Sequence, residues 1–265
     1  MGERSLKQGI AFVFKYVIEG EQHTMPRSRP KVFAIIPAAG SGTRLGGRVK
    51  KQFLPLKGKP IIVHTLQRFE HCSDVDEIIV AVPESDVVDI EALLSRYRIH
   101  KVSKAIAGGQ KRQDSVRNAL NLITANDNDI ILVHDAVRPF IDSKKISQVI
   151  KACKEFEAAV VAVQPKDTIR RSTGGGFFDQ TVDRTALWLV QTPQAFKAKL
   201  LFKAFDRAYE DKYYSTDEAA LVERLGIKAR IVEGSYDNIK ITTLEDLELG
   251  ALILDRWQIK GAHES

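Results

Sequence analysis

An apolar run and a glycine-rich loop follow one another in residues 32–53, which read VFAIIPAAGSGTRLGGRVKKQF. The β-branched and aromatic residues at 32–36 predict a strand that is buried on both faces. Gly40 and Gly42 come soon after it, and glycine lets a backbone adopt a positive φ and approach a ligand closely. Consecutive N–H groups in such a loop can cradle a phosphate. This stretch therefore predicts a phosphate-binding loop at the end of a buried strand.

Two better-known phosphate loops do not fit it. No Gly-Lys-Ser/Thr closes the loop as in a Walker A motif, and Gly40, Gly42 and Gly46 are spaced one residue too widely for the dinucleotide-binding GxGxxG pattern. The loop instead carries two cations, Arg44 and Lys51. Cations beside backbone amides favour a phosphorylated ligand.

Beyond this loop, short apolar runs alternate with amphipathic segments. The predicted strands include 32–36, 77–82, 130–135 and 158–163, and the predicted helices are 61–70, 86–97, 113–122 and 144–156, the last capped by Asp142 or Ser143. Such alternation predicts an α/β fold with a mostly parallel sheet and helices on both faces. Ligands of such sheets bind at the carboxyl ends of the strands. Three glycines at 174–176 predict the turn of a hairpin.

The composition is that of a globular protein. Of 265 residues, 44% are hydrophobic and 28% are charged, and a chain of this length buries roughly three quarters of its unfolded surface without a disulfide or metal. Cys72 and Cys153 have neither zinc-binding nor redox spacing, which indicates a reducing compartment, the cytoplasm. No run of about 18 apolar residues predicts a membrane-spanning helix, so we expect no membrane partner.

The net charge of +6 raises the question of nucleic acid. Residues 1–31 hold six Lys/Arg and three Glu, a net charge of +3, which leaves +3 for the rest of the chain. The later cations stand singly in loops without the aromatic residues of RNA-binding motifs, so we expect no nucleic-acid partner. We expect 1–31 to be a flexible extension, which leaves import into a plastid open, and 32–260 to be one domain.

Two further loops follow predicted strands. Gly108 and Gly109 precede Arg112 and Ser115 at a helix start, where a hydroxyl is available to a base or ribose; an ordinary polar helix start is the alternative. Asp135 and Arg138 follow the apolar residues 130–133. They either face a nucleotide and its Mg²⁺ or pair with each other. We interpret the adjacent His134 as structural.

Eight motifs in the same order resemble the 2-C-methyl-D-erythritol 4-phosphate cytidylyltransferase family, over residues 32–257. After the loop at 37–53 they are GGQKRQDSV (108–116), HDAVRPF (134–140), KDT (166–168), TVDR (181–184), QTPQAF (191–196), TDEA (216–219) and NIKIT (238–242). Two residues differ from what family members often carry, because Gln110 replaces an acidic residue and Lys50 a proline.

The resemblance implies a Rossmann-like nucleotidyltransferase fold with a projecting β-arm at about 166–190, through which two subunits form a homodimer. It assigns residues to CTP: Pro37, Ala38, Ala39, Gly40, Gly42, Gly108, Gly109, Arg112, Ser115, Asp135 and Ala136. It assigns others to the polyol phosphate: Arg138, Thr168, Arg184, Thr192, Lys240 and Thr242. Lys240 alternates with Ile239 and Ile241 like a strand residue on a polar face.

The resemblance also implies a reaction, the transfer of CMP from CTP to 2-C-methyl-D-erythritol 4-phosphate with release of pyrophosphate. Arg44 and Lys51 would stabilise the transition state, and Arg184 and Lys240 would position the polyol phosphate. Mg²⁺ or another divalent cation would be held mainly by the CTP phosphates, with Asp135 as a candidate ligand.

Two other functions remain open at this point. A ribitol 5-phosphate cytidylyltransferase would share the CTP site, although TVDR and TDEA favour the methylerythritol enzyme. A nucleotide-binding regulator would bind without turnover, but it would not need both pairs of cations.

Overall fold

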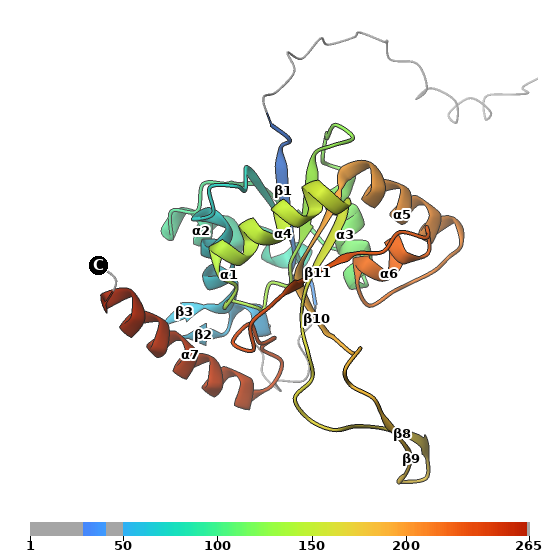
Figure 1. Cartoon of the computed structure of the whole chain (residues 1–265). Helices are drawn as coiled ribbons and strands as arrows, with labels where there is room; N and C mark the ends of the chain where they lie inside the picture. Colours follow the sequence, from blue (N-terminus) through green and yellow to red (C-terminus); the bar gives the residue numbers. More distant parts are fainter. Residues whose placement is uncertain (1–28, 41–49, 264–265) are drawn as a thin grey trace, which may run out of the picture.

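The computed structural model describes residues 29–40 and 50–263, and its centre is a seven-stranded sheet in the order β11-β7-β10-β6-β1-β4-β5 (Figure 1). The strands are β1 (Val32–Pro37), β4 (Glu77–Val82), β5 (Val102–Ala107), β6 (Ile130–Val133), β7 (Ala158–Val163), β10 (Leu189–Lys197) and β11 (Arg230–Glu233). Every pair is parallel except those of β10, which runs antiparallel to β6 and β7. The predicted α/β fold with a mostly parallel sheet is confirmed.

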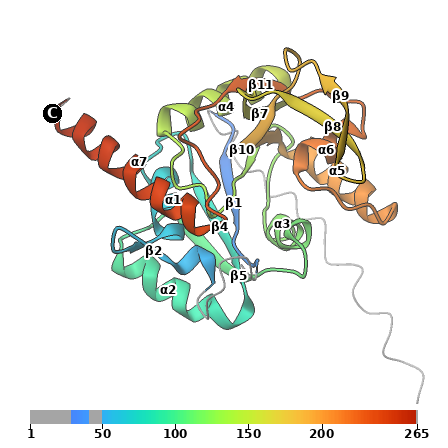
Figure 2. The same ribbon diagram turned by 90° about the horizontal axis from the view of Figure 1, so that it is seen from below.

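Helices cover both faces of this sheet, as Figure 2 shows. One face packs against α1 (Ile61–Glu70), α2 (Val87–Arg96) and α4 (Ser143–Phe156). The other packs against α3 (Arg112–Leu120), α5 (Ala198–Glu210) and α6 (Glu218–Glu223). Side chains of β1 alternate between the two cores, because successive residues of a strand point to opposite faces.

The four predicted helices are present with small shifts at their ends. Only α1 has the predicted bounds, whereas a turn of 3-10 helix, η3 (Glu84–Asp86), precedes α2. Asp142 is the N-cap of α4, since its side chain accepts a hydrogen bond from the backbone N–H of Lys144 at 2.7 Å.

A third apolar cluster lies beside the sheet. The long helix α7 (Leu244–His263) packs there on the small hairpin of β2 (Pro55–Leu56) and β3 (Lys59–Pro60). Phe140 and Ile241 are buried in this cluster. It connects the segment before α7 to the loop after β6, where predicted site residues lie.

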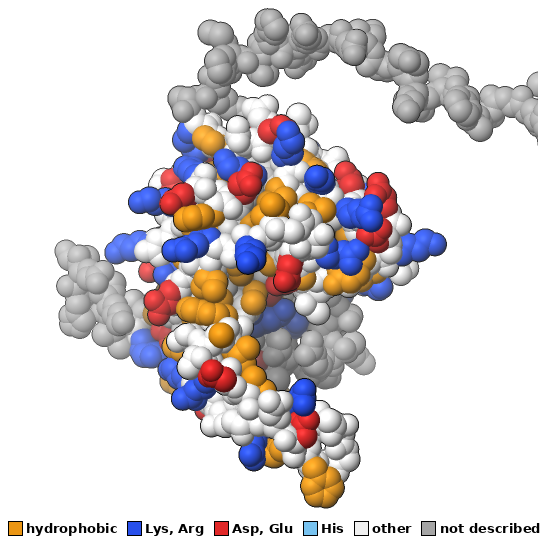
Figure 3. All heavy atoms as spheres, turned by 45° about the vertical axis from the view of Figure 1, so that its right-hand side comes forward, with side chains coloured by type: hydrophobic (Ala, Val, Ile, Leu, Met, Phe, Trp, Pro, Cys, Tyr) orange, Lys and Arg blue, Asp and Glu red, His pale blue; other side chains and the backbone are white. Residues whose placement is uncertain are grey.

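The predicted hairpin projects from the body as an arm (Figure 1). Its strands are β8 (Ile169–Gly174) and β9 (Phe177–Val182). The three glycines at 174–176 have φ values of 67° to 108°, which other residues rarely adopt. Nearly every arm residue is exposed, and Phe177 at the turn is 80% exposed. Figure 3 shows hydrophobic atoms at the end of the arm.

Candidate active site

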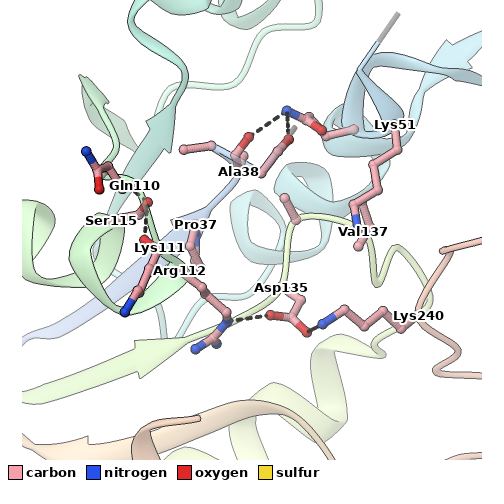
Figure 4. A pocket seen from close by; sticks show the side chains of 15 residues that line it. Pro37, Ala38, Lys51, Gln110, Lys111, Arg112, Ser115, Asp135, Val137 and Lys240 are labelled. Carbon is pink, nitrogen blue, oxygen red and sulfur yellow. Dashed lines mark hydrogen bonds and ion pairs between the residues drawn. The ribbon is translucent and has the colours of Figure 1, made fainter. Parts of the chain in front are cut away.

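A pocket lies at the carboxyl ends of β1, β5 and β6 (Figure 4). The pocket is lined by the end of β1, the loops that follow these strands, the start of α3, the 3-10 turn η2 (Lys51–Phe53) and the segment before α7. The lining residues are Pro37, Ala38, Ala39, Gly40, Lys51, Gln52, Gly109, Gln110, Lys111, Arg112, Ser115, Asp135, Ala136, Val137 and Lys240. The residues assigned from the sequence include all of these except Gln52, Gln110, Lys111 and Val137.

Some assigned residues do not line this pocket. Among the described residues these are Gly108, Arg138, Thr168, Arg184, Thr192 and Thr242. Gly42 and Arg44 lie outside the described residues.

The first loop is held at its base by Gln52. This side chain is 1% exposed, and its Nε2 donates to the carbonyl oxygens of Ala38 at 2.6 Å and Gly40 at 3.4 Å. The positive φ predicted for Gly40 is wrong. A Cβ on Gly40 would meet no atom of residues 29–40 and 50–263 within 4 Å, and Gly40 lines the pocket.

Neighbouring lysines point to different places. Lys51 lines the pocket, whereas the Nζ of Lys50 contacts both carboxylate oxygens of Asp86, at 2.7 and 2.8 Å, and the hydroxyl of Ser85 at 3.1 Å. Where family members often have a proline, this chain thus ties the end of the loop to the residues after β4. Lys51 is the lysine of this pair that reaches the pocket.

The second loop packs directly on the first. A Cβ on Gly108 would come within 2.3 Å of the Cβ of Ala39 and 2.7 Å of the Oγ of Ser115, so only glycine fits there. The hydroxyl of Ser115 accepts from the N–H of Gly109 at 3.1 Å and donates to the carbonyl of Lys111 at 3.2 Å. Gly108 therefore shapes the pocket from behind rather than lining it.

Three cations surround the carboxylate of Asp135. The Nε of Arg112 lies 3.0 Å from Oδ1, while the Nζ of Lys240 lies 2.9 Å and the Nε of Arg138 lies 3.5 Å from Oδ2. Burial alone would raise the pKa of Asp135, but Arg112, Lys240 and Arg138 outweigh it and hold this pKa well below its usual range. Asp135 is therefore ionised. The sequence left open whether Asp135 faces a ligand or pairs with Arg138, and in the structure it both lines the pocket and pairs with Arg138.

Lys240 reaches Asp135 from irregular backbone. The prediction that residues 239–241 form a strand is wrong, because the N–H of Ile241 makes a single hydrogen bond, to the carbonyl of Val137 at 2.9 Å, and Ile241 packs in the cluster under α7. Asn238 anchors the same segment through its Nδ2, which donates to the carbonyl of Thr192 at 2.9 Å.

His134 and Thr192 form a buried chain of hydrogen bonds behind the pocket. The Nε2 of His134 lies 3.0 Å from the carbonyl of Arg138, which can only accept, so in the neutral ring Nε2 carries the proton. The Nδ1 of His134 is then an acceptor for the Thr192 hydroxyl, 3.0 Å away, and that hydroxyl itself accepts from the N–H of Asp135 at 3.1 Å. The Thr192 hydroxyl, which was assigned to the polyol phosphate, is thus occupied by contacts within the protein. Both ring nitrogens of the neutral His134 are occupied as well.

We expect this neutral histidine to make the fold sensitive to acid. Burial lowers the pKa of His134 to about 4 from 6.5. The unfolded chain therefore binds the proton first as the pH falls, and stability is lost between about pH 6.5 and 4. A shift of this size corresponds to about 3 kcal/mol of unfolding free energy.

Chemical denaturation of the wild type and of His134→Gln at pH 7 and pH 4.5 would measure this loss. The wild type should lose more unfolding free energy on acidification than the variant, whose side chain does not titrate. Contributions of other groups cancel in that difference. Equal losses in both proteins would contradict the assignment.

The remaining assigned residues lie farther away. The Thr242 hydroxyl donates to the carboxylate of Asp246, in the first turn of α7, at 2.8 Å, and Thr242 does not line the pocket. Thr168 lies at the base of the arm, and Arg184, after β9, donates to the carbonyl of Lys166. The structure thus separates Arg184 from the pocket that Lys240 lines in the same chain.

Two buried polar side chains near the pocket, a glutamine and a glutamate, were not predicted as site residues. Gln52 lies in the loop at 37–53 and Glu218 in the TDEA motif, but neither was assigned a role from the sequence. The sequence signal that could have identified them is a polar residue within such a motif, because spacing alone does not tell which side chain points inward.

In the described parts of the chain, no three His, Cys, Asp or Glu residues cluster as metal ligands, and no helix has the length and apolar character to cross a membrane.

Comparison with known proteins agrees with this architecture. The family model described as 2-C-methyl-D-erythritol 4-phosphate cytidylyltransferase matches residues 32–256. Proteins of that name from Syntrophus aciditrophicus and Clostridium perfringens are 44% and 46% identical, over 86% and 83% of this chain and 97% and 96% of theirs. A crystal structure of 4-diphosphocytidyl-2C-methyl-D-erythritol synthase superposes with a TM-score of 0.72 at 33% identity, over 85% of this chain and 99% of that one. This chain belongs to the 2-C-methyl-D-erythritol 4-phosphate cytidylyltransferase family.

Proposed function

We propose that this protein transfers CMP from CTP to 2-C-methyl-D-erythritol 4-phosphate in the non-mevalonate synthesis of isoprenoid precursors. An oxygen of the methylerythritol phosphate attacks the α-phosphorus of CTP, the bond from that phosphorus to the bridging oxygen breaks, and pyrophosphate leaves. The product is 4-diphosphocytidyl-2-C-methyl-D-erythritol. The observation that carries the proposal is the family match over residues 32–256.

This reaction needs cations in the pocket but no general base. A phosphate monoester has a second pKa of about 6, so it is already largely dianionic at pH 7 and needs no proton removed. Catalysis then consists of holding two anions together and stabilising the charge that develops at the α-phosphate. Lys51, Arg112 and Lys240 line the pocket, and Lys51 is our transition-state stabiliser, together with Arg44.

A divalent cation fits the donors that are present. Asp135 is an ionised carboxylate that lines the pocket, and Mg²⁺ in nucleotide sites is commonly bound by one or two carboxylates and the substrate phosphates. When bound, Mg²⁺ would neutralise charge on the triphosphate. Asp135 is our candidate ligand.

A second copy of the chain is the expected partner. The arm exposes Phe177 and Phe178, which are 80% and 68% exposed, and Arg184 lies apart from the pocket of its own chain. We propose that two subunits pair through their arms and that Arg184 enters the partner's pocket. The cytoplasm stays the expected compartment.

Release of pyrophosphate from CTP tests the reaction. Methylerythritol phosphate should support release with Mg²⁺, and ribitol 5-phosphate should support little. Preference for ribitol 5-phosphate would favour the other cytidylyltransferase, and CTP binding without release from either substrate would favour a regulator.

Arg184→Ala and Lys240→Ala should mainly weaken binding of the methylerythritol phosphate. Losing a charged hydrogen bond costs about 1.5–3 kcal/mol, roughly a 10- to 150-fold loss of affinity. Calorimetry with each substrate would measure it, and CTP affinity should change little. Arg171→Ala is a control, because Arg171 is an arm arginine that pairs with Asp179. An equal loss of CTP affinity would contradict this division of roles.

A further inference from the structure

The TDEA motif places a buried acid beside the pocket without lining it. Glu218 is 1% exposed, and its Oε1 lies 2.7 Å from the Nη1 of Arg112. Its other oxygen, Oε2, is buried and has no hydrogen-bond partner among residues 29–40 and 50–263. Arg112 is thus the hydrogen-bond partner seen for this carboxylate, and Arg112 lines the pocket.

Arg112 lies between two carboxylates that come from different elements. Its Nε donates to Asp135, after β6, at 3.0 Å, and its Nη1 donates to Glu218, at the start of α6, at 2.7 Å. Figure 4 shows the first of these contacts. Because guanidinium is planar and its donors are fixed in direction, two partners at separate nitrogens set both the position and the plane of the group.

The backbone around Glu218 is fixed to the central sheet. Gln194 of β10 is fully buried, and its amide donates to Asp217 at 2.8 Å and accepts from the N–H of Ala219 at 2.9 Å. The residues on both sides of Glu218 are therefore held by one side chain. The carboxylate is presented from a rigid support, as a group that orients another must be.

Stability alone does not explain this acid. Burial raises the pKa of Glu218, although Arg112 opposes that rise, so the ionised form is destabilised where it lies. Buried ion pairs are often no more stabilising than apolar residues of the same volume. The geometry accounts for the pair better as a device that holds Arg112.

We propose that Glu218 is a positioning residue for CTP binding, which it supports by holding Arg112 against Asp135 on the nucleotide side of the pocket. This inference rests on the proposed function, since it takes CTP as the ligand. It extends the binding machinery to a residue that no ligand in the pocket would touch.

Calorimetric titration with CTP tests it on the full-length protein. Glu218→Gln keeps the shape and one acceptor but removes the charge. We expect CTP affinity to fall about five- to tenfold, less than for loss of a direct charged hydrogen bond, because Glu218 acts through Arg112 and the variant keeps an acceptor. Arg112→Met should weaken CTP at least as much. The double variant should bind no more weakly than Arg112→Met alone, because Glu218 acts through Arg112.

Two further variants keep the result decisive. Glu223→Gln makes the same change on the exposed end of α6 and should leave CTP affinity unchanged. Glu218→Met replaces the first variant if that one does not fold, with thermal unfolding of each protein as the check. Wild-type affinity in the Glu218 variants, or losses that multiply in the double variant, would overturn the inference. No CTP binding by the wild type would instead overturn the proposed function.

Discussion

Replacing Lys51 with methionine should lower kcat by roughly two to four orders of magnitude, as loss of preorganised charge stabilisation typically does. Lys51 lines the pocket from the first position of η2. The next residue in that turn, Gln52, is hydrogen-bonded to the base of the glycine loop. Its charge is therefore in place before the reaction begins. Methionine keeps the length and apolar stem of the side chain, so the variant removes the charge with little change of shape.

The neighbouring lysine supplies the control. Lys50→Met removes the same charge one residue earlier, but Lys50 contacts Asp86 and lies outside the set that lines the pocket. We expect its kcat to stay within a few-fold of the wild type, as for most changes away from reacting groups. Turnover near normal in Lys51→Met, or an equal loss in both variants, would refute the assignment. The sequence makes the same prediction for Arg44→Ala.

The parallel part of the sheet could be predicted because its strands are short continuous apolar runs. Residues 77–82 and 158–163 have the predicted bounds, since strands covered on both faces have few polar positions. β10 has a different pattern. Its segment QTPQAF contains two glutamines and a proline, and Gln194 is buried because its amide binds the start of α6. A side chain that is buried by a contact with a distant part of the sequence does not produce the regular apolar pattern by which a strand is predicted.

The last helix was not predicted for a related reason. In α7 the leucines 244, 249 and 252 are exposed, while Ile253 and Leu254 are buried. Apolar residues on both sides of a helix blur the single stripe by which an amphipathic helix is recognised. The arrangement follows from packing on the small β2–β3 hairpin, which lies well before α7 in the chain.

The pocket could be predicted in outline because loops after parallel strands meet at one edge of the sheet. Its internal pairing could not. Arg112 and Glu218 are 106 positions apart, and Arg112 and Asp135 are 23 apart. Charge and motif indicate that such residues belong to a site, but only the folded chain shows which carboxylate holds which cation. The strand-like alternation around Lys240 misled for the same reason, because Ile241 is buried against α7 rather than in a sheet.

Mixing two impaired variants should restore activity if the arm completes the site of a partner. In that arrangement each pocket takes Lys51 from one subunit and Arg184 from the other. A dimer of one Lys51→Met chain and one Arg184→Ala chain then has one intact site and one site with both changes. Random pairing makes about half of the dimers mixed, by two-fold symmetry, so about a quarter of all sites should be intact.

The measurement is turnover after co-refolding of equal amounts of the two variants, against each variant refolded alone. Differently tagged subunits would verify that mixed dimers form. The assay uses a methylerythritol phosphate concentration that saturates wild-type sites but lies far below the Kd of sites without Arg184. Activity should then recover to about a quarter of the wild-type value, because the intact sites, and essentially no others, turn over. If Lys51 and Arg184 served the same pocket from one chain, every site in a mixed dimer would carry one change and mixing would restore nothing. Absence of recovery in verified mixed dimers would thus place Arg184 outside the partner's pocket, and the separation between Arg184 and Lys240 in a single chain would need another explanation.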